Sequence, residues 1–271
     1  MARARLDRKG VSEVVSTVMI ITVTLGMIVS GVFFAQLNLS MQAQATEFEN
    51  GKASMISLAK TIESLVPGGK GTASYVQFNI NSGGLALTSG NERLTIKVNG
   101  ETIFTDTVNL IRFRGGAGVS SPQYVVLRGV STGLSDEHMR HLIVSPEDPA
   151  PLGWVYLTRE KGAWVVADFG RARVVASGAI RLTVDGMNYT TVNTVEITYI
   201  RIVWGRFGGS NTYDVCAKIV NVATTIKKLE SPSVTVSVER GGYSKSYSVS
   251  DEDAEYTLVF LTVVNVEVSM W

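Results

Sequence analysis

A run of 33 residues without a charged side chain, from Val14 to Thr46, constrains this chain more than any other feature. Its first part, 14–35, is mostly apolar and exceeds the roughly 20 residues that a helix needs to cross a bilayer. The ten residues before Val11 carry four basic side chains and one acid. Because positive flanks stay in the cytoplasm, this order predicts that the rest of the chain lies outside the cell.

The apolar run continues into an amphipathic stretch without a break. No proline or strong turn signal interrupts residues 11–66, and a Pro-Gly-Gly sequence follows at 67–69. This pattern predicts one helix over 11–66, about 84 Å long, and a hinge over 67–71. A cleaved secretory signal would have a shorter apolar region. In the second half of the expected helix, apolar residues recur at helical spacing: Met55, Leu58, Ile62 and Leu65.

Two details of the apolar part suggest contacts with other helices. Glu13 stands at its start, where a lone carboxylate is costly in lipid and favours a specific partner, such as a newly freed α-amino group. It could equally be an acid at headgroup level that the helix dipole favours. Thr22, Gly26 and Ser30 fall four apart on one face, a spacing that lets helix backbones approach closely. Ordinary tolerance of small residues in a membrane helix is the alternative.

The segment RKGVSEVVSTVMIITVTLGMIVSGVFF resembles the N-terminus of archaeal type IV pilin-like and archaellin-like filament subunit precursors, which carry a class III signal peptide. The resemblance covers about the first 60 residues. It implies that residues 1–10 are removed by cleavage between Gly10 and Val11, directly after Lys9 and Gly10. It also implies that Glu13 is the acid near the mature N-terminus. That acid would be third, whereas bacterial type IV pilins have it fifth.

The resemblance also implies a function and a set of partners. The helices would bundle into the core of an extracellular helical homopolymer, and the precursor would reside in the cytoplasmic membrane. A prepilin peptidase, an assembly ATPase and a membrane platform protein would act on it. We expect an adhesive pilus rather than a swimming filament, because VSEVVSTV differs from the usual start of an archaellin helix.

The remainder, 72–271, alternates apolar and polar residues with a period of two between Gly, Asn and Asp turns. Hairpin signals are Asn99-Gly100 and Asp185-Gly186, and further turns are expected at 160–162 and 240–242. The expected fold is therefore α+β: a long hydrophobic helix followed by an all-β, immunoglobulin-like β-sandwich. The sandwich could be one domain, or two with a seam near 190–193. The apolar final strand is expected either to be covered within a sheet or to pair with a neighbouring subunit.

Little in the sequence suggests chemistry. A formal net charge of +1 gives no reason to expect nucleic-acid binding. One cysteine and two histidines, His138 and His141, leave few ligands for a metal, and we expect no metal, no cofactor and no catalytic residues. The acidic sequence 251–253 is expected to be a solvated turn rather than a calcium site, since an EF-hand glycine is missing.

Two alternatives and two glycosylation sequons complete the expectations. The chain could be a membrane-anchored binding module whose tryptophans, Trp154, Trp164 and Trp204, line a carbohydrate face, although core packing of these rings is the plainer interpretation. An anchored enzyme is disfavoured. We expect a glycan at Asn188 in an extracellular turn and none at Asn38, because a bundled helix leaves no space for one.

Overall fold

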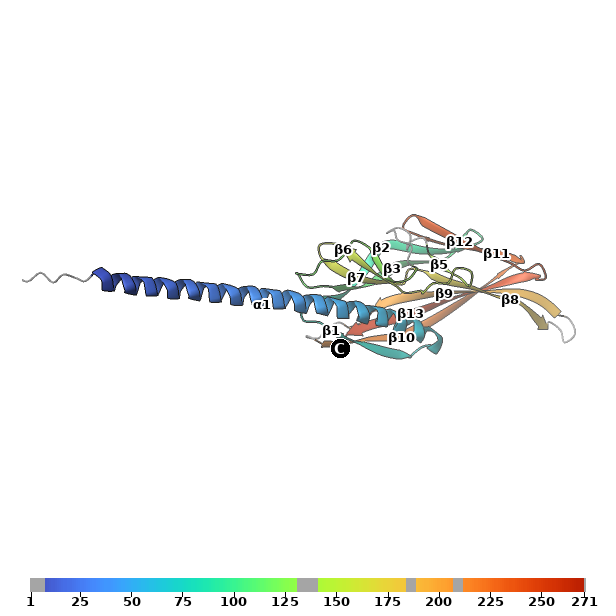
Figure 1. Cartoon of the computed structure of the whole chain (residues 1–271). Helices are drawn as coiled ribbons and strands as arrows, with labels where there is room; N and C mark the ends of the chain where they lie inside the picture. Colours follow the sequence, from blue (N-terminus) through green and yellow to red (C-terminus); the bar gives the residue numbers. More distant parts are fainter. Residues whose placement is uncertain (1–7, 131–140, 184–188, 207–211, 271) are drawn as a thin grey trace, which may run out of the picture.

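The computed structural model describes residues 8–130, 141–183, 189–206 and 212–270, and of 8–12 and 212 only the backbone. One long helix is followed by a mostly-β region with two sheets, which places the protein in the α+β class (Figure 1). Helix α1 spans Arg8–Leu65, and the short 3-10 helix η1 spans Val66–Gly68. The predicted long helix is therefore confirmed, with its start three residues earlier than Val11.

The β region contains two sheets built from thirteen described strands. The six-stranded sheet has the order β1-β10-β13-β9-β8-β5 and the seven-stranded sheet the order β12-β11-β2-β3-β7-β6-β4. The strands are β1 (Ala73–Asn79), β2 (Gly84–Val98), β3 (Glu101–Arg114), β4 (Val125–Arg128), β5 (Ile143–Val144), β6 (Trp154–Arg159), β7 (Ala163–Asp168), β8 (Ala172–Thr183), β9 (Tyr189–Trp204), β10 (Thr212–Leu229), β11 (Ser233–Arg240), β12 (Tyr243–Ser250) and β13 (Tyr256–Met270).

The turn signals in the sequence form the hairpins expected of them. Asn99 and Gly100, with φ of 49° and 82°, connect β2 to β3 in a two-residue turn that needs positive φ at both positions. Gly241 and Gly242 connect β11 to β12 in the same way, with φ of 55° and 85°. The turn at 160–162 connects β6 to β7. The Asp185-Gly186 signal lies outside the described residues.

The strands are long enough to serve two hydrophobic cores. One core lies around the second half of α1, which packs against β1 and β10 of one sheet and against β3, β4, β6 and β7 of the other. In the second core the two sheets pack on each other without the helix. Within β13, Val263 belongs to this second core and Val264 to the first. Because neighbouring residues of a strand point to opposite faces, one strand buries opposite faces at its two ends.

The final strand, β13, lies between β10 and β9 and is paired along both edges. The expectation of a covered strand is confirmed, and pairing of β13 with a neighbouring subunit would require one of these ladders to break. Its pairing with β9 is parallel. Residues 190–193, where a seam between two domains was considered, lie inside β9 and not in a linker.

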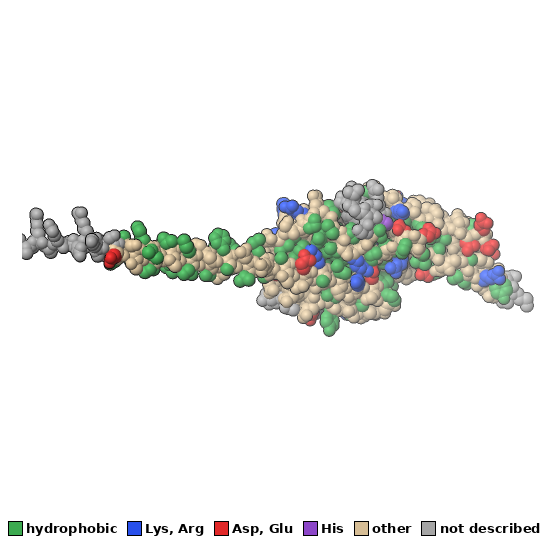
Figure 2. Space-filling view, viewed as in Figure 1, with side chains coloured by type: hydrophobic (Ala, Val, Ile, Leu, Met, Phe, Trp, Pro, Cys, Tyr) green, Lys and Arg blue, Asp and Glu red, His purple; other side chains and the backbone are tan. Residues whose placement is uncertain are grey.

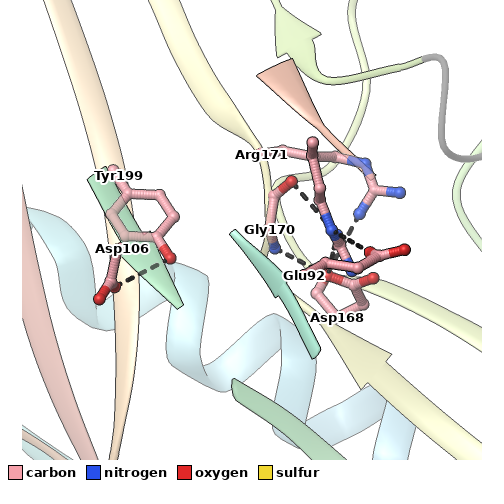
Figure 3. A network of polar contacts seen from close by, with 7 residues as sticks. Glu92, Asp106, Asp168, Gly170, Arg171 and Tyr199 are labelled. Carbon is pink, nitrogen blue, oxygen red and sulfur yellow. Dashed lines mark hydrogen bonds and ion pairs between the residues drawn. The ribbon is translucent and has the colours of Figure 1, made fainter. Parts of the chain in front are cut away.

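A buried ionic network lies at the end of β7, where the chain crosses from one sheet to the other (Figure 3). Asp168 accepts hydrogen bonds from a guanidinium N–H of Arg240 at 2.8 Å and from the N–H of Gly170 at 2.7 Å. Arg240 also donates to Glu92 of β2 at 2.8 Å. Arg171 stacks over the Trp154 ring, 4.1 Å from its centre. These contacts fix the crossover, with Asp168 and Arg171 fully buried.

Candidate functional site: the projecting helix

The first half of α1 projects from the β region with its side chains uncovered. Every residue from Glu13 to Ala43 is exposed, and Met27 and Leu39 are 69% and 65% exposed. Figure 2 shows this half as a largely hydrophobic rod outside the body of the molecule. Within the described residues, α1 is the one helix long and apolar enough to cross a membrane. Such a surface marks an interaction with protein or lipid, because water solvates it poorly.

Two hydroxyl groups on this half of the helix donate hydrogen bonds to the helix itself. Thr17 donates to the carbonyl of Glu13 at 2.9 Å, and Thr22 donates to the carbonyl of Val18 at 2.8 Å. Each side chain thus reaches back to the carbonyl four residues earlier. Polar groups paired in this way can enter an apolar environment without losing a partner.

The small residues of the projecting part have no role inside the subunit. Thr22, Gly26 and Ser30 are all exposed, and a Cβ placed on Gly26 would meet nothing within 4 Å. A Cβ on Gly51, in the buried half, would lie 2.0 Å from the Phe113 ring. Packing within the subunit therefore requires glycine at position 51. At position 26 the same packing would allow a larger side chain.

The remaining predicted site residues are described only in part. Glu13 is exposed at the outer end of the projecting half. Gly10 and Val11 lie in α1 by their backbone, as does Lys9, but their side chains lie outside the described residues. Asn188 also lies outside the described residues. Asn38 is exposed on the projecting helix.

The second half of α1 is fixed to the β region by Glu47, a residue that the sequence analysis did not single out. Its carboxylate accepts hydrogen bonds from the N–H groups of Asn81 and Ser82 at 3.0 Å and of Gly83 at 2.8 Å. The Ser82 hydroxyl donates to it at 2.7 Å. Burial raises the pKa of Glu47, but these donors together outweigh that effect and lower its pKa. The one available signal was that Glu47 is the first charge after the uncharged run.

A second acid of α1, Glu63, makes a similar contact nearer the end of the helix. Glu63 receives two N–H donors of the Arg128 guanidinium, at 3.1 and 2.6 Å, and the N–H of Gly153. Such two-pronged pairs fix geometry as well as charge. Near the exit of the helix, Gln44 accepts the N–H of Gly118 at 2.9 Å. Together with the first core, these contacts make α1 a rod held rigidly by the β region.

The other candidates do not assemble into a chemical site among the described residues. Nδ1 of His141 lies 3.4 Å from a carboxylate oxygen of Asp148, and the imidazole stacks on Trp154. His138 lies outside the described residues. No group of three His, Cys, Asp or Glu side chains there could hold a metal. Trp154 is buried, and Trp204 is 54% exposed at the end of β9. Trp164 is half-buried beneath the Arg112 guanidinium, so these three rings form no common carbohydrate-binding face.

Comparison with known proteins finds no matching family model, no matching curated protein and no matching solved structure. What the chain does must therefore be inferred from its own residues. The feature to be explained is the projecting half of α1, 13–43, which is exposed throughout and carries no charge after Glu13.

Proposed function

We propose that the protein is a structural subunit of an extracellular type IV-like adhesive pilus that polymerises through α1 into a helical homopolymer. The observation that carries the proposal is the projecting half of α1, 13–43, which has no covering partner within the described chain. Bundling these helices among identical neighbours would remove their apolar surface from water. The rigid attachment through Glu47 and Glu63 would give every subunit the same angle between helix and β region.

Before assembly, the same helix would lie in the cytoplasmic membrane. A prepilin peptidase would remove residues 1–10, and an assembly ATPase and a membrane platform protein would move the mature subunit into the filament. Glu13 would then pair with the α-amino group of a neighbouring copy. The hydroxyls of Thr17 and Thr22, which donate hydrogen bonds within the helix, suit both the lipid and the filament core.

In the same proposal, the β region forms the outer surface and mediates adhesion, with no catalytic role. Its two sheets would be an immunoglobulin-like β-sandwich into which α1 is inserted at one end. Asn188 would carry a glycan on the outer surface.

The chief alternative is a membrane-anchored adhesion or binding module, for which a helix able to span a membrane is sufficient. A minor pilin and an archaellum subunit are related alternatives. A simple anchor, however, would not need the helix to continue as one rod from the membrane into the core of the β region. This continuity favours the filament.

The deciding experiment is N-terminal sequencing and intact-mass measurement of protein in filaments sheared from cells. We expect a chain that begins at Val11 in a high-molecular-weight fraction. A chain that begins at Met1 or Ala2 and is confined to membranes would contradict the proposal. Processing at Val11 without filaments would leave the minor pilin or the surface module.

A matched pair of variants tests the role of Glu13. Glu13→Ala should be processed and inserted in the membrane but give at least ten-fold fewer filaments, because the freed amino group loses its partner. Glu49→Ala removes an acid of the same helix that is 68% exposed and forms an ion pair with Lys52. It should assemble normally. Equal filament yields for both variants would show that Glu13 has no part in assembly.

A further inference from the structure

The β region has two ends that differ in charge. We call the end from which α1 emerges the near end. There Gln44 of α1 contacts Gly118, and the N–H of Gly115 donates to the carbonyl of Ala163 at the start of β7. At the far end the parallel strands β9 and β13 begin, and they run from there toward the near end. Figure 2 shows acidic side chains gathered at the end away from the helix.

The near end carries a basic rim formed by four residues of β3, β6 and the turn that follows β6: Arg112, Arg114, Arg159 and Lys161. One of the four, Arg112, is neutralised by Glu160 at 2.7 Å and stacks over the Trp164 ring at 4.4 Å. The other three are exposed. Glu160 is the one acid of the turn 160–162 and is already paired. Among the described residues no acid forms an ion pair with these three, so the rim presents positive charge beside the exit of the helix.

The far end carries an acidic tip formed by five carboxylates: Glu230, Asp251, Glu252, Asp253 and Glu255. Backbone hydrogen bonds fix its position. The N–H of Asp251 donates to Pro232 at 3.3 Å, and the N–H of Glu255 donates to Thr191 at 2.9 Å. Lys228 pairs with Glu230 at 2.8 Å, which leaves the other acids of the tip in excess.

The dimensions of the molecule let these two ends meet. The exposed part of α1, 13–43, is about 47 Å long at about 1.5 Å per residue. Strand β10, with 18 residues, extends about 59 Å at about 3.3 Å per residue. A second copy displaced by one body length along α1 would therefore lie beside the projecting helix of the first. Its acidic tip would then reach the basic rim.

We propose that copies of this chain stack end to end, with the acidic tip of one copy against the basic rim of the next. The occupant of the rim is thus a second copy of the chain, and the inference rests on the proposed function. Because the two surfaces differ, the contact is heterologous and can repeat from one copy to the next, as an open filament requires. Attraction between the ends also sets the register of the helices, since complementary charge chiefly gives orientation and specificity.

The test is a charge-reversal series in the full-length chain, with filaments counted in sheared fractions. The rim variant R159E/K161E and the tip variant E252K/D253K should each lower filament yield at least ten-fold, because like charges then meet. The four substitutions combined should restore the yield to within about two-fold of wild type. K245E on β12 and E196K on β9 reverse exposed charges elsewhere and should leave the yield unchanged.

The outcomes separate this inference from the proposed function. If wild type forms filaments and the reversals have no effect, or the combined variant is not rescued, the end-to-end contact is wrong and the filament stands. If wild type forms no filaments under any assembly condition, the proposed function itself fails.

Cross-linking gives an independent measurement. In a Cys216→Ser background, Lys161→Cys with Glu252→Cys in one chain should give a ladder of disulfide-linked oligomers, and either substitution alone should give none. Filaments without a ladder would overturn the contact.

Discussion

At the scale of single residues, Asp168 is a fully buried acid that lies between Arg171 and Arg240 (Figure 3). Burial raises the pKa of Asp168, but attraction to Arg240 and then to Arg171 outweighs it and holds the pKa well below its usual range. Burial lowers the pKa of Arg171 to about 10 against the attraction of Asp168, so both groups are charged at neutral pH. A pair of this kind is costly to break from one side, because an unpaired charge stays buried.

Replacing Asp168 by alanine should therefore destabilise the folded protein by about 3–5 kcal/mol. Arg240 would retain Glu92 as a partner, whereas the buried Arg171 would lose the attraction of the Asp168 carboxylate. Denaturant unfolding in detergent micelles, followed by tryptophan fluorescence, measures the loss. Asp253→Ala, at the solvated tip, is the control and should stay within about 0.5 kcal/mol of wild type. Equal midpoints for the two variants would contradict the importance of the network.

The Asp168 carboxylate should make the free energy of unfolding depend on pH. Its pKa is depressed in the folded state, so its contribution is fully present above the unfolded value, near pH 3.9, and is lost as pH falls toward the folded value. The unfolding free energy of wild type should fall below about pH 5. In Asp168→Asn the fall should be shallower by up to about 1.4 kcal/mol per pH unit. Parallel curves for the two proteins, measured by denaturant unfolding from pH 2 to 6, would contradict this.

Two glycines of the same helix should respond in opposite ways to a larger side chain. Gly51→Ala places a methyl group against Phe113 in the first core and should destabilise the subunit by about 1–3 kcal/mol. Gly26→Leu meets nothing in the subunit and should leave its unfolding in detergent unchanged, while filament yield drops because neighbouring helices can no longer approach closely. Normal filaments from Gly26→Leu would show that the face of Thr22, Gly26 and Ser30 does not contact neighbouring helices.

At the scale of elements, Glu47 joins α1 to the segment between β1 and β2. Glu47→Ala leaves the N–H groups of 81–83 without their acceptor, and we expect their local opening free energy to fall by about 1–3 kcal/mol. Amide hydrogen exchange measured residue by residue should show faster exchange at 81–83 and unchanged exchange in β13. Glu49→Ala is the matched control on the same helix. Unchanged exchange at 81–83 would show that other contacts hold this segment.

The elements that the sequence predicted are those with a local cause. The uncharged run and the one-sided apolar spacing after it give α1, and residues that tolerate positive φ, such as Asn99 and Gly100, give the hairpins. The apolar final strand likewise indicated a covered position. Each of these signals acts over a few residues.

The elements that escaped prediction depend on distant partners. Period-two alternation predicts a strand that buries one face along its whole length. Strand β13 instead buries Val263 in one core and Val264 in the other. This change of face depends on the helix that enters between the sheets at one end only. Glu47 depends on donors 34 to 36 residues later, in a segment whose own sequence shows only a turn. In both cases the pairing is set by tertiary packing, which short-range patterns do not encode.

At the scale of the whole molecule, truncated chains should show that the two halves of α1 have different roles, one in assembly and the other in folding. Among the residues whose side chains are described, removing residues 1–43 deletes only the exposed helix 13–43, and it should yield a soluble monomer with unchanged stability. Removing residues 1–66 also deletes the helical side of the first core, whose large side chains are Phe48, Met55, Leu58, Ile62 and Leu65. At about 1.5–3 kcal/mol for each fully buried side chain, that loss rivals the 5–15 kcal/mol by which a domain is usually stable.

Thermal unfolding followed by circular dichroism, together with size-exclusion chromatography, compares the two truncated chains. The chain 44–271 should elute as a monomer with a cooperative transition, and the chain 67–271 should aggregate or unfold without one. Because the shorter deletion keeps the basic rim and the acidic tip but lacks the bundling helix, the chain 44–271 should not polymerise by itself. Stable filaments of 44–271 would mean that the ends alone drive assembly, and a cooperative fold of 67–271 would mean that α1 is an addition to the β region rather than part of its core.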